Sequence, residues 1–514
     1  MKKIIYNTTG VKIILICCAV LTCFSFSMPQ TSAPIDVTEL TITQIHEFYK
    51  SGKFNCQQLV GAYIERINKF NKQINAITSV NQEAMAIAKS LDEEYKRTKK
   101  LRPLHGIPII VKDNINTKGM TTTAGAIALQ NFYPNTDAFV IDKLIKAGAI
   151  VIAKSNMAEW AFTPWGSFSS THGATLNPYN VNYTPAGSSG GTGAAVAANL
   201  GAVGLGTDTG NSIRGPSSHN ALVGFRTTLG LISREGIVPL YLVNDVVGPM
   251  CRTVEDATKV LEVMVGIDAK DPITKHSEGK TQVHYLPFLK KNGLKGARIG
   301  VLRTLSDANP DPEIKALFEK SLIDMKKLGA QIIDPVVIPD FDTLRKNQWC
   351  QTFKTDVESF LAKYVKNDTI KTLEDIIRIG SKSKSASDRL VLLRSSDAVI
   401  NNCGDTYTAP RRIAYRKAIE DEMDRLKLDA IVYPTWNNKP AQIDASYKDY
   451  KGDNSQIISP HTGQPAFTVP MGFSNGNLPA GIQFLGRMFA EPTLIKLVYS
   501  YEQGTKHRVP PLLK

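Results

Sequence analysis

The chain has 514 residues, of which 42% are hydrophobic and 21% charged, a composition typical of a globular protein with a sizeable core. Its formal net charge is +14, but the basic residues are spread along the chain and not interleaved with aromatic residues, which argues against a nucleic-acid-binding groove. Beyond residue 33, no stretch of sequence is long and apolar enough to cross a membrane.

The N-terminal segment has the pattern of a secretory signal. Three lysines precede a mostly apolar run over 13–26, which small and polar residues follow. A run of about fourteen residues is too short to span a bilayer comfortably. We therefore expect a signal peptide over residues 1–27 and an exported protein that begins near Met28. An uncleaved segment that retains the protein at the membrane is one alternative, and a lipoprotein signal at Cys23 is another.

The remaining elements alternate between helices and strands. In chain order, the predicted elements are helices over 43–49, 56–70 and 82–97, a strand over 107–111, a helix over 136–147, a strand over 149–153, a helix over 193–200, a strand over 202–205, a helix over 254–265, a strand over 297–302, a helix over 312–328, a strand over 330–333, a mostly helical region over 341–422, strands over 430–433 and 466–469, and a helix over 494–502.

This alternation predicts an α/β fold with a large mixed β-sheet covered by helices on both faces. The polar segment 268–296 is interpreted as a connection, and no internal repeat is found. We therefore expect a single domain over residues 28–514.

Four of the seven cysteines lie beyond the N-terminal segment, namely Cys56, Cys251, Cys350 and Cys403. They are far apart and form no CxxC or metal-like spacing, so no metal site is predicted. In an exported protein they could form two disulfides in any of three pairings. Buried free thiols are the alternative.

The glycine-rich tract 185–216 carries the chemistry. Glycines let several backbone N–H groups converge on one point, which suits either a phosphate or the oxyanion of an acyl-transfer reaction. The phosphate alternative lacks the lysine of a P-loop. Acyl transfer needs a hydroxyl nucleophile, and Ser188, Ser189 and Ser212 lie in the tract. A GxSxG pattern around Ser189 is weak in so glycine-rich a run.

Two residues could serve as the base. His219 follows Ser212 closely but has no evident carboxylate partner, and a lone histidine is more often a surface or packing residue. Lys112 comes directly after the apolar strand 107–111, where desolvation would lower its pKa. A lysine that reaches solvent from the end of a strand is the alternative. The residues alone leave these interpretations open.

In their order and spacing, the motifs of this chain resemble the amidase signature family. The resemblance rests on Pro239 and on segments 106–113, 154–159, 177–178, 187–191, 206–210, 212–214, 223–226, 463–466, 469–472, 481–483 and 486–487. It spans about residues 40–511. Ser212 lies 24 residues after Ser188, as the family pattern requires, and Lys112 lies 76 residues before Ser188.

The resemblance implies that Ser212 is the nucleophile, Ser188 the bridging serine and Lys112 the base. It also implies a cis peptide bond between Gly187 and Ser188. The oxyanion would be stabilised by backbone N–H groups of the loop formed by Thr209, Gly210, Asn211 and Ser212.

Three further residues are implied as structural support for this loop, namely Ser189, Asp208 and Arg214. A direct role of Arg214 in substrate binding is the alternative. Two positions depart from the commonest family pattern, because Asn211 and Ala186 stand where glycine is usual. Asparagine tolerates a left-handed backbone better than most residues, so we expect the loop to keep its conformation, and we regard Ala186 as the milder change.

We therefore expect an exported amidase that hydrolyses a carboxylic or peptide amide to an acid and ammonia or an amine. No cofactor, metal or nucleic-acid partner is expected, the oligomeric state would be a monomer or a homodimer, and only the N-terminal segment would contact a membrane. Residues around Trp160 and Ala161 and the helical region 341–411 are expected to shape the pocket.

Two alternatives come from other functional classes. The first is a glutaminase-type A subunit of a tRNA-dependent amidotransferase, which would need charged tRNA and a partner subunit. The second is an inactive binding protein on the same scaffold.

Overall fold

The computed structural model describes residues 35–366, 368–395, 403–475 and 477–513. Residues 36–514 group into one compact unit. The predicted signal peptide over 1–27 lies outside the described residues. Within the described part of the chain, no helix combines the length and the apolar character that crossing a membrane requires.

Thirteen strands are found among the described residues. In chain order these are β1 (Ile77–Val80), β2 (Pro108–Lys112), β3 (Ile150–Ser155), β4 (Phe168–Ser169), β5 (Gly173–Ala174), β6 (Val203–Asp208), β7 (Val223–Arg226), β8 (Val246–Cys251), β9 (Arg298–Val301), β10 (Gln331–Ile333), β11 (Ala430–Pro434), β12 (Ala466–Ser474) and β13 (Leu478–Leu485).

Helices account for much of the rest. The α-helices are α1 (Ile42–Ser51), α2 (Cys56–Ile74), α3 (Ala84–Thr98), α4 (Phe139–Lys146), α5 (Gly190–Ala197), α6 (Arg214–His219), α7 (Val254–Met264), α8 (Arg303–Ser306), α9 (Pro312–Lys327), α10 (Phe341–Leu344), α11 (Phe353–Tyr364), α12 (Leu373–Ile379), α13 (Lys384–Leu393), α15 (Pro410–Arg425), α16 (Ser446–Asp449), α17 (Ser459–Thr462) and α18 (Glu491–Thr505).

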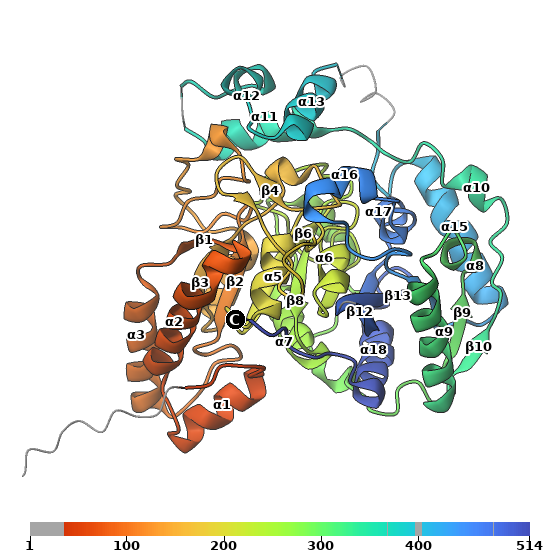
Figure 1. The fold of residues 1–514 in the computed structure, drawn as a ribbon, viewed down its shortest axis with the longest axis horizontal. Helices are drawn as coiled ribbons and strands as arrows, with labels where there is room; N and C mark the ends of the chain where they lie inside the picture. Colours follow the sequence, from red (N-terminus) through yellow and green to blue (C-terminus); the bar gives the residue numbers. More distant parts are fainter. Residues whose placement is uncertain (1–34, 367, 396–402, 476, 514) are drawn as a thin grey trace, which may run out of the picture. The chain divides into compact units, whose positions relative to one another are not determined.

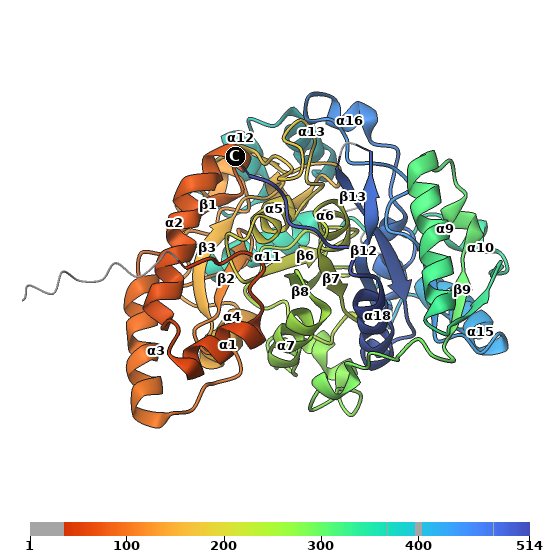
Figure 2. The same ribbon diagram turned by 60° about the horizontal axis from the view of Figure 1, so that its bottom comes forward.

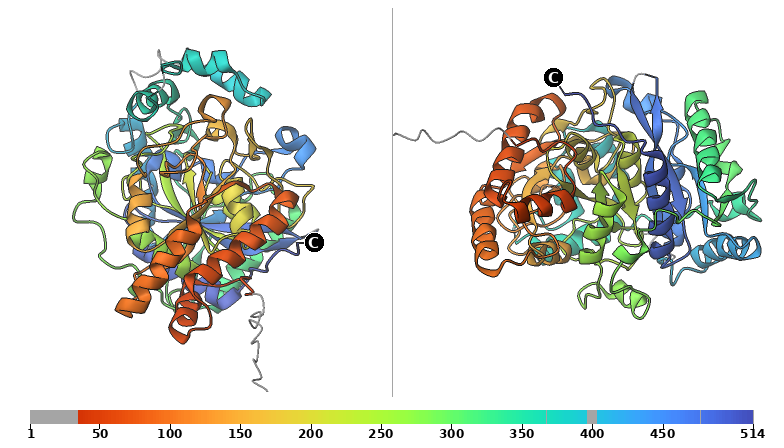
Figure 3. Two further views of the ribbon diagram at one scale, coloured as in Figure 1. Left: turned by 90° about the vertical axis from the view of Figure 1, so that its left-hand side faces the viewer. Right: turned by 90° about the horizontal axis from the view of Figure 1, so that it is seen from below.

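Eleven of the described strands form one mixed sheet in the order β1-β3-β2-β6-β8-β7-β12-β13-β11-β9-β10. Helices pack on both of its faces, as the alternation of elements predicted (Figures 1, 2 and 3). Helices α2 and α3 lie at the β1 end of the sheet, and α9 and α15 lie at the β10 end. The predicted α/β fold with a large mixed sheet is confirmed.

The parallel pairing of β2 with β6 positions the chemistry. Both strands are fully buried, and their register pairs Ile109 with Val203 and Val111 with Leu205. Since parallel strands present their carboxyl ends at the same edge of a sheet, Lys112 at the end of β2 and Asp208 at the end of β6 lie on the same side.

Some elements differ from the sequence predictions. The predicted helix over 193–200 begins earlier, at Gly190, and ends at Ala197. Strands β7, β8 and β13 were not predicted, because β8 contains Gly248 and Pro249, β13 contains Pro479 and Gly481, and β7 is only four residues long. Proline and glycine weaken the usual signal of a strand, although tertiary packing here accommodates them.

Helices α11, α12 and α13 form a group above the sheet in Figure 1. Their apolar residues join one cluster with segment 124–132 and with residues near Trp160, and this cluster includes Phe353, Leu373 and Leu390. The mostly helical character predicted for this part of the chain is confirmed. These helices pack on the rest of the fold through this apolar cluster.

Of the four cysteines beyond the N-terminal segment, two form a disulfide and two are buried free thiols. Cys350 and Cys403 form a disulfide across 53 residues. Cys56 and Cys251 are free and buried. The sequence allowed either outcome, because pairing depends on which residues the fold brings close together.

Candidate active site

Lys112 is completely buried at the end of β2. Its Nζ donates hydrogen bonds to Ser188 Oγ at 2.7 Å and to Thr207 Oγ1 at 2.8 Å. Burial lowers the pKa of Lys112 to about 7, although the carboxylates of Asp208 and Asp245 act in the opposite direction. Lys112 therefore does not reach solvent, and a substantial fraction of it is neutral near neutral pH.

Ser188 is held by backbone contacts on both sides. The Gly187–Ser188 peptide bond is cis, as the resemblance implied. A Cβ atom at Gly187 would lie 2.4 Å from the carbonyl oxygens of Gly166 and Thr163, so only glycine fits there. The carbonyl oxygen of Ser188 accepts a hydrogen bond from the backbone N–H of Ala158 at 3.0 Å. Helix α5 starts two residues later and fixes the direction in which the chain leaves.

Ser212 lies in the loop that joins β6 to α6. Its hydroxyl donates a long hydrogen bond of 3.4 Å to Asn211 Oδ1, and no hydrogen bond joins it to Ser188 among the described residues. Thr209, Gly210, Asn211 and Ser212 all line a cavity of about 380 Å³, a size suited to a small ligand. The structure thus joins Lys112 to Ser188 and places Ser212 on the cavity surface.

The backbone N–H groups of Gly210, Asn211 and Ser212 donate no hydrogen bond within the described part of the chain. Such groups are costly to bury without an acceptor. Next to a cavity they are available to a negatively charged oxygen of a ligand.

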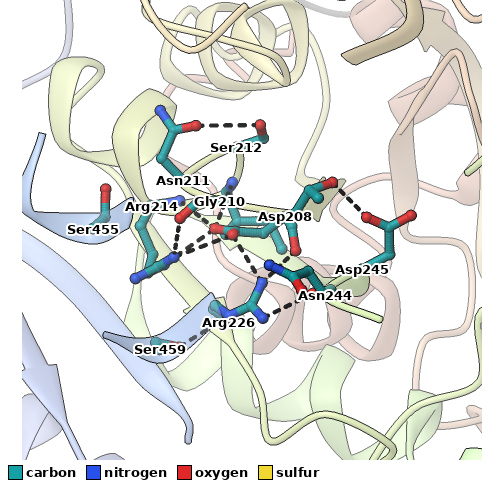
Figure 4. A network of polar contacts seen from close by, with 12 residues as sticks. Asp208, Gly210, Asn211, Ser212, Arg214, Arg226, Asn244, Asp245, Ser455 and Ser459 are labelled. Carbon is teal, nitrogen blue, oxygen red and sulfur yellow. Dashed lines mark hydrogen bonds and ion pairs between the residues drawn. The ribbon is translucent and has the colours of Figure 1, made fainter. Parts of the chain in front are cut away.

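A buried ion network supports the loop (Figure 4). Asp208 accepts hydrogen bonds from Arg214 Nε and Nη2, each at 3.1 Å, and from Arg226 Nη1 at 2.9 Å. Burial would raise the pKa of Asp208, but the two guanidinium groups outweigh it and lower the pKa to about 2. Arg214 also donates to the carbonyl oxygen of Gly210 at 2.6 Å. Asp208 and Arg214 therefore hold the loop in place through hydrogen bonds to its backbone and to each other.

Ser189 also contacts this region, since its hydroxyl donates to the carbonyl oxygen of Thr207 at 3.2 Å. Three supporting residues were not singled out from the sequence, namely Thr207, Arg226 and Asp245. Thr207 accepts from Lys112, and Asp245 accepts from Thr209 Oγ1 at 2.5 Å. Arg226 belongs to a segment that carries the family resemblance, and a buried arginine partner for Asp208 could have been sought there.

The cavity is walled by several distant segments. Residues 161–165 form one wall. The region 341–411 contributes Trp349, Gln351, Ser385 and Arg389. Tyr241, Tyr450 and Gln456 also contribute to the lining. Ala161 and four residues of the region 341–411 therefore line this cavity. Trp160 instead packs edge to face on Phe353 in the core beside the pocket.

His219 is buried at the end of α6, so of the two positions expected for a lone histidine it has the packing one. Its ring packs edge to face on Trp436, with 4.4 Å between the ring centroids. Burial lowers its pKa to about 3. His219 does not line the cavity, and within the described ranges no hydrogen bond joins its ring to Ser212.

Of the two positions that depart from the family pattern, Ala186 has an unusual backbone conformation and Asn211 does not. Asn211 does not adopt a positive φ, so the conformation of the loop does not depend on its tolerance of left-handed backbone. Ala186 does adopt one, with φ of 61°, a region that favours glycine. The change at Ala186 is therefore the one with a backbone cost.

No group of three or more histidine, cysteine, aspartate or glutamate side chains is arranged for a metal ion in the ranges that the structure describes. The polar groups at the cavity are instead hydroxyls, amides and one guanidinium. Together with the buried amine of Lys112, the hydroxyls and backbone N–H groups at the cavity are of the kinds that acyl transfer needs.

Comparisons with known proteins agree with this chemistry. The family model for amidases matches residues 58–495. A probable amidase of Arabidopsis thaliana is 32% identical over 99% of both chains. The A subunit of the glutamyl-tRNA(Gln) amidotransferase of Caldanaerobacter subterraneus is 31% identical over 93% of this chain and 99% of its own. The native peptide amidase of Stenotrophomonas maltophilia has a similar structure, with a TM-score of 0.81 and 33% identity over 93% of this chain and 99% of the amidase. The chain therefore belongs to the amidase signature family and is a hydrolase of amide C–N bonds.

Proposed function

We propose that the protein is a stand-alone exported amidase in which Ser212 attacks the amide carbonyl, Ser188 relays the proton and Lys112 is the base. The observation that carries this proposal is the buried hydrogen bond of 2.7 Å between Lys112 Nζ and Ser188 Oγ, beside the cavity that Ser212 lines. A lysine with a pKa near 7 is suited to general-base catalysis at neutral pH.

The reaction would begin with neutral Lys112. As Ser212 Oγ attacks the carbonyl carbon, its proton passes to Ser188, and the proton of Ser188 passes to Lys112. Among the described residues Ser188 Oγ donates no hydrogen bond, so its own proton is not committed elsewhere. The relay then runs in reverse and protonates the leaving amine, and water hydrolyses the acyl-enzyme.

The carbonyl oxygen becomes an oxyanion during the attack. The backbone N–H groups of Gly210, Asn211 and Ser212, which the described part of the chain leaves without an acceptor, would donate to it. The network around Asp208 holds this loop before substrate arrives, so little reorganisation is needed when charge develops. Arg214 supports the loop through the Gly210 carbonyl and is itself fully buried, which favours the structural role over contact with substrate.

The cavity favours a neutral or anionic amide with apolar groups. Aromatic side chains contribute much of its lining, and Arg389 is the one cationic side chain among the described residues that line it. These lining residues include no aspartate or glutamate, so the ammonium group of free glutamine would find no counter-ion among them. A peptide amide, whose α-nitrogen is part of an uncharged amide, suits this surface better.

The amidotransferase alternative has support from the sequence identity to A subunits. That assembly would need access to charged tRNA inside the cell. The charge pattern of residues 1–27 and the Cys350–Cys403 disulfide both favour an oxidising compartment outside the cytoplasm. A reporter protein fused to residues 1–33 would separate the two, since export supports the stand-alone amidase and retention in the cytoplasm supports the subunit.

The activity itself can be tested with purified protein against peptide amides, aliphatic amides, aryl amides and free glutamine. We expect release of ammonia from peptide amides and little from glutamine. Labelling by a serine-directed fluorophosphonate should occur at Ser212 and be lost in Ser212→Ala. Activity confined to free glutamine would overturn the proposed substrate class, and absence of labelling with absence of all hydrolysis would favour an inactive binding protein.

A further inference from the structure

One wall of the cavity lies directly over the loop of the nucleophile. A Cβ atom at Gly210 would be 3.0 Å from the Cη2 atom of Trp349, so the indole ring rests against this glycine. Trp349 and Gln351 both line the cavity. Cys350 lies between these two residues, and it is the residue that forms the disulfide with Cys403. The disulfide is therefore attached to the wall itself.

The segment that bears this wall is held by hydrogen bonds and ring contacts and not by regular secondary structure. Gln348 Nε2 donates to the carbonyl oxygen of Leu344 at 2.6 Å, and Arg411 Nη2 donates to Cys350 Sγ at 3.4 Å. Residues 345–352 lie between α10 and α11 and contain no helix or strand. Arg412 Nη2 donates to the carbonyl oxygen of Gln348 at 2.9 Å, and the Trp349 ring packs edge to face on His461 at 4.7 Å. Trp349 nevertheless remains 40% exposed. The Trp349 ring also contacts the ring of Tyr241, with 6.3 Å between the centroids, so the side chain is packed on one part and open on the rest.

The other end of the disulfide is firmly placed. Shortly after Cys403, the hydroxyl of Thr406 donates to the carbonyl oxygen of Thr462, and Tyr407 Oη donates to the carbonyl oxygen of Leu229 at 2.6 Å. Arg416 on α15 donates to the carbonyl oxygen of Thr406 at 2.8 Å. The disulfide therefore ties a loop without regular secondary structure to a segment that is bonded to three other parts of the fold.

We infer that the Cys350–Cys403 disulfide positions Trp349 and Gln351 over Gly210, and that Trp349 thereby determines the affinity for amides large enough to reach this wall. The inference rests on the proposed use of the cavity as the substrate site. A small amide that occupies only the space next to Ser212 would not contact the indole ring. Opening the disulfide should therefore affect large and small substrates differently.

The size of the effect follows from the cost of ordering side chains on binding. If the wall is released, the Trp349 side chain must be immobilised when a large substrate binds, and the cost of ordering this one side chain corresponds to a rise of about three- to tenfold in KM. The turnover number should not change, because Lys112, Ser188 and Ser212 are held by other contacts. A large amide should show this rise and a small one should not.

The experiment compares oxidised and reduced protein with two probes, N-acetylphenylalaninamide and propionamide. Dithiothreitol supplies the two electrons and two protons that convert the disulfide to two thiols, and it closes to its own cyclic disulfide. Alkylation of Cys350 and Cys403 followed by peptide mapping reports the state of the bond. We expect KM for the larger amide to rise about three- to tenfold on reduction, with KM for propionamide and both turnover numbers unchanged.

Variants separate the wall from the fold as a whole. The double variant Cys350→Ala with Cys403→Ala should show the raised KM and no further response to dithiothreitol. Trp349→Ala should also raise KM for the larger amide, and Trp349→Phe should restore most of the affinity. Cys56→Ala, which removes a buried free cysteine from α2, is the control for lost packing and should leave KM unchanged.

The outcomes distinguish this inference from the proposed function. If oxidised protein hydrolyses both amides and reduction changes neither KM, the inference fails alone. If reduction lowers activity on both amides equally and lowers the melting temperature, the disulfide serves the fold in general, and the inference also fails. If oxidised protein hydrolyses neither amide, the proposed function fails, and the inference fails with it.

Discussion

The two sides of the cavity around Ser212 are built in different ways. The side that carries Lys112, Ser188 and Asp208 lies at the ends of buried strands, and these polar side chains are buried and hydrogen-bonded to other buried groups. The side that carries Trp349 and Arg389 comes from loops and helices that are partly exposed. Under the proposed function, the rigid side would perform the chemistry and the looser side would select the substrate.

The strongest test of this difference between the two sides is to remove one hydroxyl group from each. Ser212→Ala should lower kcat by about a thousandfold or more, because it deletes the proposed nucleophile. Ser385→Ala removes a serine from the opposite wall of the same cavity and should change kcat/KM by less than about threefold. Steady-state hydrolysis of N-acetylphenylalaninamide and thermal unfolding would be measured for both. Similar losses in the two variants would show that the sides do not divide the work.

The second test concerns the proposed base. Lys112→Met should lower kcat by about 10²–10⁴-fold, since it keeps the bulk of the side chain and removes the amine. Lys112→Arg should not restore activity, because arginine remains protonated. In the unmodified protein kcat/KM should rise with pH through about 7 and then level off, as Lys112 becomes neutral.

A pH profile alone would not identify the lysine, because an ordinary histidine titrates in the same range. His219 does not, since burial lowers its pKa to about 3. His219→Phe should therefore keep the rise near pH 7, and Lys112→Met should lose it in whatever activity remains. If the rise of kcat/KM near pH 7 disappears in the His219 variant and persists in the Lys112 variant, Lys112 is not the base.

The third test compares ion pairs from the two regions. Arg226→Met leaves Asp208 buried with one partner fewer and should lower the free energy of unfolding by about 3–5 kcal/mol. Lys384→Met breaks the exposed pair with Asp388 on α13 and should cost about 0.5 kcal/mol or less. Urea unfolding at pH 7 measures both, and equal costs would contradict the contrast between the regions.

The same network predicts a pH dependence of stability. Folding lowers the pKa of Asp208 from its ordinary value of 3.8 to about 2, so the carboxylate stabilises the native state above about pH 4. This contribution is lost as the pH falls through about 2. Because Arg226→Met weakens the shift, the variant should lose less stability than the unmodified protein over that interval.

The sequence predicted the rigid side far better than the other. Lys112 and Ser188 were identified from the order and spacing of the motifs, and in the structure their side chains are hydrogen-bonded to each other. Thr207 and Asp245 were missed, because a threonine or aspartate at the end of a strand has no local pattern that names its partner. Strands β8 and β13 were missed for a related reason, since their glycines and prolines are accommodated only by packing.

On the looser side the sequence identified a region but no residue. Trp349 and Arg389 reach the cavity because distant helices pack on the segment around Trp160, and helical periodicity does not say which residues of a region will face a shared space. The pairing of Cys350 with Cys403 was left open on the same grounds. Residues whose roles depend on contacts between distant segments are thus the ones that only the structure assigns.

The last and smallest test concerns the two positions where glycine is usual. Ala186 has a left-handed backbone, so Ala186→Gly should relieve about 1 kcal/mol of strain. Glycine also gains freedom in the unfolded chain, which offsets about 0.4–1 kcal/mol of that gain and leaves the free energy of unfolding nearly unchanged. Asn211 has no left-handed conformation to relieve, and its side chain contacts both Ser212 and the carbonyl oxygen of Pro164. Asn211→Gly should therefore destabilise the protein by about 1 kcal/mol in urea unfolding, since only the entropic cost and the lost contacts remain. If Asn211→Gly stabilises the protein and Ala186→Gly destabilises it by the same amount, the backbone conformations assigned to these two residues are wrong.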